Sequence, residues 1–160
     1  MIERTHGKRR YIPNLTQQMA TAEANYHRLQ RLIGSFDDVE SLSVTLQQST
    51  TAPAIELRLR FLERFSYTTT LEVQLGAGEQ WWQKPLHLRL YHDMRMAEVV
   101  KSADYRQYRG SYGYPNNQGL MADEKAQLNS YLALLLQQAM QHGTHLQRQP
   151  RQLANMLAAV

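Results

Sequence analysis

Between residues 42 and 101, hydrophobic and polar residues alternate in five consecutive stretches of the chain. Such alternation is typical of β-strands that have one buried face and one face in water. The connections between the stretches are short, as in hairpins. We therefore predict an antiparallel meander of five strands. A sheet with a short sixth strand after residue 101 is the alternative. The five stretches are residues 42–46, 55–61, 67–75, 86–91 and 96–101.

A helical period precedes this region. Six hydrophobic positions recur at steps of three and four residues, which places them on one stripe of a helix. Asn14 is suited to cap the first turn, and Gly34 is suited to end the last one. The pattern is too short for a coiled coil, so we expect an amphipathic helix lying on the sheet. The six positions are Leu15, Met19, Ala22, Tyr26, Leu29 and Ile33.

A second helical period follows the strands. Asp123 and Glu124 suit the positive end of a helix dipole, and Gly143 suits its end. The segment between them carries a broad hydrophobic face. Helices and strands that each have one hydrophobic face pack economically as two layers. We therefore predict an α+β fold in which an N-terminal and a C-terminal helix cover one face of the sheet.

Residues 102–119 are rich in tyrosine and arginine, and their glycines, proline and asparagines predict a long ordered loop. Residues 1–143 are expected to form a single domain. Residues 144–160 are expected to form a tail, in which Leu153, Met156 and Leu157 suggest a short amphipathic helix.

The segment from His92 to Arg95 predicts a hairpin turn, because the carboxylate of Asp93 can accept from turn amides. One long strand with a bulge near Met96 and Ala97 is the alternative, since the hydrophobic parity shifts there.

Composition narrows the classes of protein. With 160 residues, 42% of them hydrophobic and 20% charged, the chain matches an ordinary globular protein. The absence of cysteine excludes disulfides and thiolate chemistry. No hydrophobic run approaches the roughly 20 residues of a membrane span, so we expect a cytoplasmic protein without membrane contact. The net charge of +4 is modest, and glutamates are interspersed among the arginines, so nucleic acid is a less favoured partner.

Several short segments together carry a family resemblance. They are residues 10–13 (Arg-Tyr-Ile-Pro), 67–69, 89–93, 97–99, 114–116 and 123–125, with Asn129. As a set they resemble the YqiB-like family of small gamma-proteobacterial proteins, a family defined as a domain of unknown function. The resemblance runs from about residue 8 to residue 143, and departs from the family pattern at Gly113, where an aspartate is expected. It implies a stand-alone cytoplasmic domain and supplies no activity, cofactor or catalytic residue.

An enzymatic hypothesis centres on His92, Asp93, Arg95 and Glu98. A general acid–base pair could be built there from Asp93 or Glu98 with His92 or His87. An adjacent His-Asp pair also occurs in metal-dependent phosphohydrolases, but the other histidines lack ligand-like spacing, so we predict no metal site and no cofactor. This alternative is a small hydrolase acting on a phosphorylated or nucleotide-like substrate.

The favoured hypothesis is a non-enzymatic binding or adaptor module. Arginine and tyrosine commonly anchor interfaces, and the alternation places several of them on the wet face of the sheet. The partner would be a protein or an anionic ligand; RNA binding on the same face is a third hypothesis. A solvated face with cross-strand Arg–Glu pairs is the purely structural interpretation. The candidate binding residues are Arg58, Arg60, Arg89, Tyr91, Arg95, Tyr112, Tyr114 and Asn116.

Overall fold

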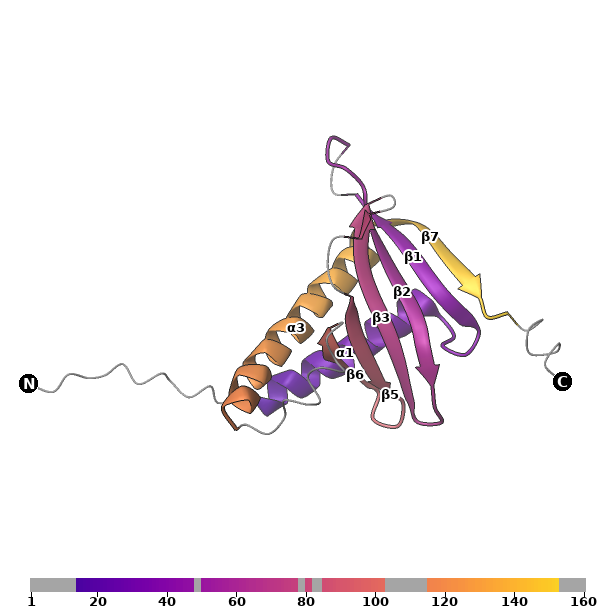
Figure 1. Cartoon of the computed structure of the whole chain (residues 1–160). Coiled ribbons are helices and arrows are strands. Elements are labelled where there is room, and N and C mark those ends of the chain that lie inside the picture. The colour runs from indigo at the N-terminus through magenta and orange to yellow at the C-terminus, as the bar shows by residue number, and fades with distance from the viewer. Residues whose placement is uncertain (1–13, 48–49, 78–79, 82–84, 103–114, 153–160) are drawn as a thin grey trace, which may run out of the picture.

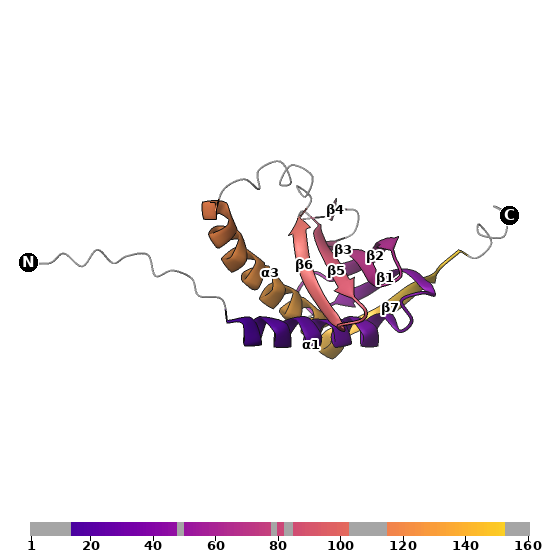
Figure 2. The same ribbon diagram turned by 90° about the horizontal axis from the view of Figure 1, so that it is seen from below.

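A long helix, a run of strands, a second long helix and a final strand follow one another in the computed structural model of the chain. The structure describes residues 14–47, 50–77, 80–81, 85–102 and 115–152. The elements are α1 (Leu15–Ile33), β1 (Val39–Leu46), β2 (Ile55–Arg64), β3 (Thr68–Ala77), β4 (Gln80–Trp81), β5 (Leu86–Tyr91), β6 (Met96–Ser102), α3 (Pro115–His142) and β7 (Gly143–Pro150). Figures 1 and 2 show both helices on the same side of the sheet. The predicted α+β class is therefore confirmed.

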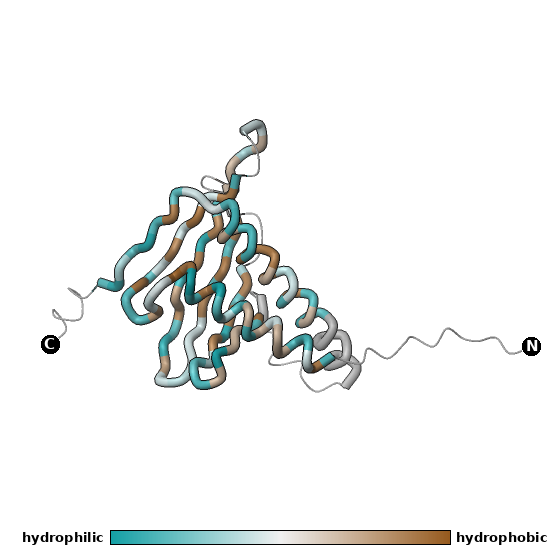
Figure 3. The backbone as a smooth tube through the Cα atoms, turned by 180° about the vertical axis from the view of Figure 1, so that it is seen from behind, coloured by the Kyte–Doolittle hydropathy of each residue, from teal (hydrophilic) through white to brown (hydrophobic). Residues whose placement is uncertain are grey.

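The five predicted strands are present and form the expected antiparallel meander. The sheet order is β6-β5-β3-β2-β1-β7, and the two-residue β4 pairs with β3. Along β5 the burial alternates strictly, with Leu86, Leu88 and Leu90 facing the core. Figure 3, seen from the helix side, shows the same alternation of hydropathy along the sheet.

The core lies between the sheet and the two helices. Fully buried leucines come from both layers, so the packing joins the first helix, the sheet and the second helix into one unit. Its largest members are Leu29, Ile33, Leu42, Leu57, Leu59, Leu71, Leu88, Leu90, Leu132 and Leu136.

Helix α1 begins and ends where the sequence predicts. The side chain of Asn14 accepts from the N–H of Gln17 at 3.1 Å, and Gly34 closes the helix with a φ of 85°. Its hydrophobic stripe is only half buried, because Leu15 and Met19 are 66% and 52% exposed. Figure 2 shows the first turns of α1 extending past β6, so no strand lies over them there.

The predicted hairpin at residues 92–95 is confirmed. Tyr91 and Met96 are paired on either side of the turn, and Arg95 adopts a φ of 53°. The alternative of one continuous strand is therefore wrong. A bulge does occur in β6, but further along, where the pairing shifts between His87 and Leu88.

Helix α3 begins earlier than predicted. Its first residue is Pro115 rather than Asp123, so the helix includes Asn116 and Gly119. Proline fits a first turn because its missing N–H and fixed φ cost nothing there. Asp123 therefore lies inside the helix and does not cap it. The remainder of the predicted tyrosine-rich loop, residues 103–114, lies outside the described residues.

The segment after α3 is a strand rather than a tail. Gly143 follows His142 directly, and β7 pairs antiparallel with β1 at the edge of the sheet. Only glycine fits at this joint, because a Cβ on Gly143 would overlap the carbonyl oxygen of Ala139 and Cγ1 of Val44. The short helix predicted near Leu153, Met156 and Leu157 lies outside the described residues.

Candidate functional site

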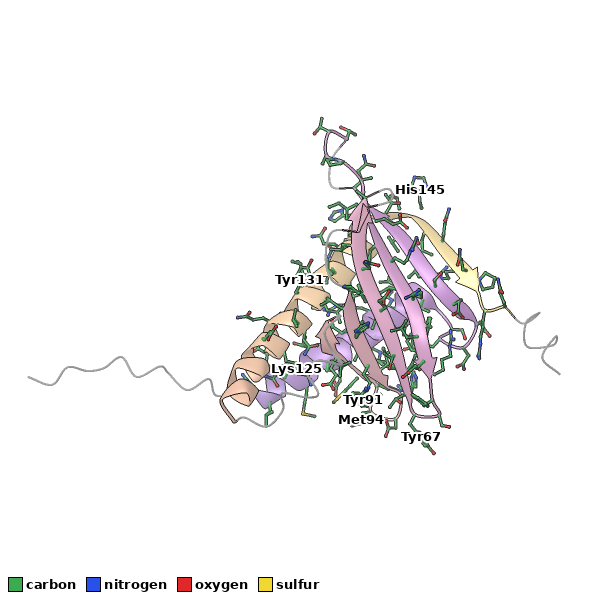
Figure 4. All side chains as sticks on the ribbon, in the orientation of Figure 1. Tyr67, Tyr91, Met94, Lys125, Tyr131 and His145 are labelled. Atoms are coloured by element: carbon green, nitrogen blue, oxygen red, sulfur yellow. The ribbon has the colours of Figure 1, made fainter. Side chains whose placement is uncertain are left out.

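The sheet surface opposite the helices is the main candidate site, and we call it the sheet face. No described helix covers it in Figures 1 and 2, and Figure 4 looks onto it. It combines a hydroxyl- and amide-bearing half on β1 and β7 with a charged half on the other strands. Its residues include Ser41, Ser43, Thr45, Glu56, Arg58, Arg60, Glu72, Gln74, His87, Arg89, Tyr91, Glu98, Gln147 and Gln149.

A row of charged residues crosses β2, β3 and β5, with Glu72 at its centre. Oε1 of Glu72 lies 3.1 Å from Nη2 of Arg60, and Oε2 of Glu72 lies 3.6 Å from Nε2 of His87. The Arg60 side chain is 54% exposed, whereas the Glu72 side chain is 17% exposed. The guanidinium of Arg60 is therefore exposed to solvent, whereas the carboxylate of Glu72 is mostly buried in the sheet face.

A second polar row lies at the β6 edge. The Tyr91 hydroxyl donates to Oε1 of Glu98 at 2.7 Å, and Nζ of Lys125 lies 2.8 Å from its other oxygen. Figure 4 labels Tyr91 at the end of β5 and Lys125 on α3. Burial and then the hydrogen bond and charge of Glu98 raise the pKa of Tyr91, while Arg89 opposes that rise. Both oxygens of Glu98 are thus engaged within the protein.

Asn129 of α3 protects this edge strand. Its side-chain oxygen accepts from the main-chain N–H of Val99 at 2.7 Å. Its own carbonyl accepts from the buried side chain of Asn25 at 3.2 Å. Asn129 therefore joins α3 to both β6 and α1.

His92 belongs to the interior side of the sheet. Its Nδ1 lies 2.9 Å from the hydroxyl of Tyr26, and its Nε2 lies 2.6 Å from Oγ1 of Thr69. The rings of Tyr26 and Phe36 pack against it, with centroids 5.9 and 5.7 Å away. Burial raises the pKa of Tyr26, and the charge of Arg95 opposes that rise. Both ring nitrogens of His92 therefore serve a hydrogen-bonded cluster that joins α1 to β3.

The residues of the enzymatic hypothesis are not brought together. His92 lies on the helix side, Glu98 lies on the sheet face, and Asp93 is exposed in the turn between them. In the described part of the chain, no group of three histidine, aspartate or glutamate side chains could hold a metal ion.

Four of the candidate binding residues lie together on one surface. Arg58, Arg60, Arg89 and Tyr91 all lie on the sheet face, whereas Arg95 is exposed in the hairpin turn. Tyr112 and Tyr114 lie outside the described residues. Asn116 falls in the first turns of α3, and its side chain is not described.

Two arginines with structural roles were missed. Nη2 and Nε of Arg64 bond the carbonyls of Val39 and Phe36, and its guanidinium stacks on Phe61 at 4.3 Å. Arg148 donates to the carbonyls of Leu32 and Ile33 at the end of α1. Neither contact has a local sequence signal, because each joins segments far apart in the chain.

A polar cleft of about 330 Å³ was also missed. It lies between the start of α1 and the middle of α3, and seven of its eight lining residues carry a side-chain amide or hydroxyl. A polar stripe on α1 at steps of three and four residues was the available signal. The lining residues are Asn14, Gln17, Gln18, Thr21, Ala126, Gln127, Asn129 and Ser130.

Comparison with known proteins gives one family. The family described as "Protein of unknown function (DUF1249)" matches residues 28–145, which run from the second half of α1 to the start of β7. The chain belongs to the DUF1249 family. The sequence resemblance to YqiB-like proteins is thereby confirmed.

Curated relatives of this DUF1249 protein agree with that assignment. It is 32% identical to "Uncharacterized protein YqiB" of Escherichia coli strain K12 over 137 residues, which is 84% of this chain and 94% of the relative. The proteins of the same description from Escherichia coli O6:H1 and O157:H7 match equally. No solved structure matches the chain. Among the described residues, no helix is both long enough and hydrophobic enough to cross a membrane.

Proposed function

We propose that this DUF1249 protein is a non-enzymatic binding module whose sheet face takes an acidic surface of a partner protein. The observation that carries the proposal is that positively charged side chains of the sheet face are more exposed to solvent than the carboxylate paired with them. Arg60 is more than half exposed while its partner Glu72 is mostly buried, and the neighbouring Arg58 is exposed as well. A partner would therefore meet guanidinium groups before it met carboxylates.

The composition of the sheet face supports a protein partner. Arginine and tyrosine are enriched where interfaces gain most of their binding energy. A guanidinium can bond both oxygens of an incoming carboxylate, which gives directional recognition. The carboxylates of Glu72 and Glu98 hold Arg60 and Tyr91 in place through hydrogen bonds. These two side chains therefore lose less rotamer freedom when a partner binds.

The alternatives have less support. The hydrolase hypothesis needs His92 and Glu98 to converge, and they lie on opposite sides of the sheet. RNA binding needs aromatic rings free to stack on bases, whereas Tyr91 is partly buried and fixed in orientation by its bond to Glu98. The cytoplasmic location stays a prediction from the sequence.

Charge reversal on the sheet face tests the proposal. The wild-type protein, Arg58→Glu/Arg60→Glu and the control Arg31→Glu are used as baits in native lysate, and captured proteins are quantified by mass spectrometry. Arg31 is an exposed arginine on α1, away from the sheet face. We expect a partner that the double variant loses at least about tenfold and that the control retains, as for disrupted charge complementarity.

Titration of the purified partner completes the test. Binding to wild type should weaken with added salt, because exposed charges are screened. Identical catches from all three baits, or a partner lost equally from the control, would contradict the proposal.

A further inference from the structure

The two edge strands of the sheet, β6 and β7, differ in what lies beside them. At the β6 edge, α3 runs alongside the strand, and Asn129 takes the N–H of Val99 at 2.7 Å. At the opposite edge, β7 pairs with β1 and with no other strand of the described residues. Figure 1 shows β7 at the margin of the sheet with no other described element beside it. Within the described residues, α3 therefore covers one edge of the sheet, and the other edge is open to further strand pairing.

An open edge strand presents unpaired main-chain N–H and C=O groups, which another strand can satisfy. Proteins usually block such edges with charged residues (especially lysine), interior proline, bulges or a covering helix or loop. In β7 the only proline is the last residue, Pro150, and there is no lysine. A bulge does occur at His145, whose φ is 50° and where the pairing with β1 shifts. A second shift lies between Val39 and Ser41, so the regularly paired run is Gln147 to Gln149.

The charges of β7 do not oppose pairing with an identical strand. Its one formally charged residue is Arg148, and that guanidinium is bound to the carbonyls of Leu32 and Ile33. Gln147 and Gln149 lie on the sheet face and carry amides, which can donate to and accept from their own kind. Leu146, on β7 itself, is an exposed hydrophobic side chain that a second copy could cover.

We propose that β7 is a homodimerisation edge, at which two copies of the chain pair their β7 strands antiparallel about a two-fold axis. The closed β6 edge is essential to this arrangement. If both edges were open, β6 of one copy could meet β7 of the next and the contact would propagate into a filament. With one open edge, the contact closes after two chains. The inference is independent of the binding role proposed for the sheet face.

The regular run is short, so the dimer is expected to be weak. Interfaces below the standard size of about 800 Å² per partner associate transiently. Sedimentation or light scattering from roughly 10 μM to 1 mM covers that regime. We expect the mean mass of the wild type to rise toward twice that of the chain over this range.

A pair of lysines on the edge tests the position. In Gln147→Lys/Gln149→Lys, like charges would face one another across the axis, which should raise the dissociation constant at least about tenfold. The matched control is Gln137→Lys/Gln141→Lys, which adds the same charge at exposed positions of α3. The control should associate like the wild type.

Amide hydrogen exchange on the wild type gives a reading that does not depend on any variant folding. Amides within residues 147–149 should exchange more slowly at high protein concentration, while those of β6 should not change. A wild type that stays monomeric throughout, an edge variant that associates like the control, or protection that does not depend on concentration would each overturn the proposal.

Discussion

The guanidinium of Arg148 donates to the main-chain carbonyl of Leu32, at 3.2 Å from Nε and 2.9 Å from Nη2. The same Nε lies 3.0 Å from the carbonyl of Ile33. The last carbonyls of a helix have no partner within the helix, and a cation there also opposes the negative end of its dipole. The last described strand thus completes the end of the first helix.

Replacing this arginine should therefore destabilise the fold. For Arg148→Ala we expect a loss of about 1–3 kcal/mol in the free energy of unfolding, because charged hydrogen bonds to a half-buried helix end are lost. Arg148→Lys should recover part of the loss, since it keeps the charge without the planar fork. Chemical denaturation measures both. Gln149→Ala, on the other face of β7, is the control and should change stability by less than about 0.5 kcal/mol.

A second prediction concerns Asn129. The main-chain N–H of Val99 is bonded to its side chain, and Val99 is buried. Asn129→Ala would leave that donor without its partner, at a cost of about 1–3 kcal/mol. Exchange of the Val99 amide should accelerate at the same time. Ser130→Ala, at an exposed neighbouring position, should leave both quantities near wild type; equal effects of the two variants would contradict this role of Asn129.

Tyr91 gives a prediction of pH dependence. Its pKa in the folded protein is raised above the ordinary value of 10.0, first by burial and then by Glu98. The folded state therefore holds the proton more tightly than the unfolded state. The corresponding stability is present below pH 10 and is lost as the pH rises through the folded pKa.

Comparison of two proteins isolates this contribution. Between pH 9 and pH 11 (roughly the interval that brackets an ordinary tyrosine), unfolding free energy should fall more steeply for wild type than for Tyr91→Phe. Tyrosinate absorbance should also reveal a late-titrating group that disappears in the variant. Tyr67→Phe, at an exposed tyrosine, is the control. Parallel curves for wild type and Tyr91→Phe would show that Tyr91 is not responsible.

Two glycines should respond differently to alanine. At Gly143 the added Cβ would overlap main-chain and side-chain atoms, so Gly143→Ala should cost roughly 3 kcal/mol or more. At Gly34 nothing lies within 4 Å of the added Cβ, and only its positive φ is unfavourable, at about 1–2 kcal/mol. Thermal or chemical denaturation orders the two. A milder effect at Gly143 than at Gly34 would contradict the close packing of the joint.

Local periodicity was sufficient for most of the architecture. Leu71 and Val73 alternate with Glu72 and Gln74 because each strand has one buried and one exposed face, and the sequence displays that alternation directly. The cap of α1 by Asn14 was predictable for a similar reason, since capping involves residues only three apart.

Contacts between distant segments were not predictable in this way. The bonds from His92 to Tyr26 and Thr69 turn its ring away from Glu98, although the two residues are only six positions apart. The segment after α3 looked like a polar tail because β7 is exposed along nearly its whole length. Its strand conformation depends on β1, which no window around residue 146 contains.

Helix α3 passes directly into β7 at residues 142–143, with no connecting residue between them. One inserted residue there would have to rotate the end of the helix or slide β7 by one position along β1, and a one-position slide reverses every side chain of a strand. Arg148 would then point away from α1, and Gln147 and Gln149 would point into it. Length changes among natural relatives should therefore be rare at this joint and commoner in the β1–β2 connection.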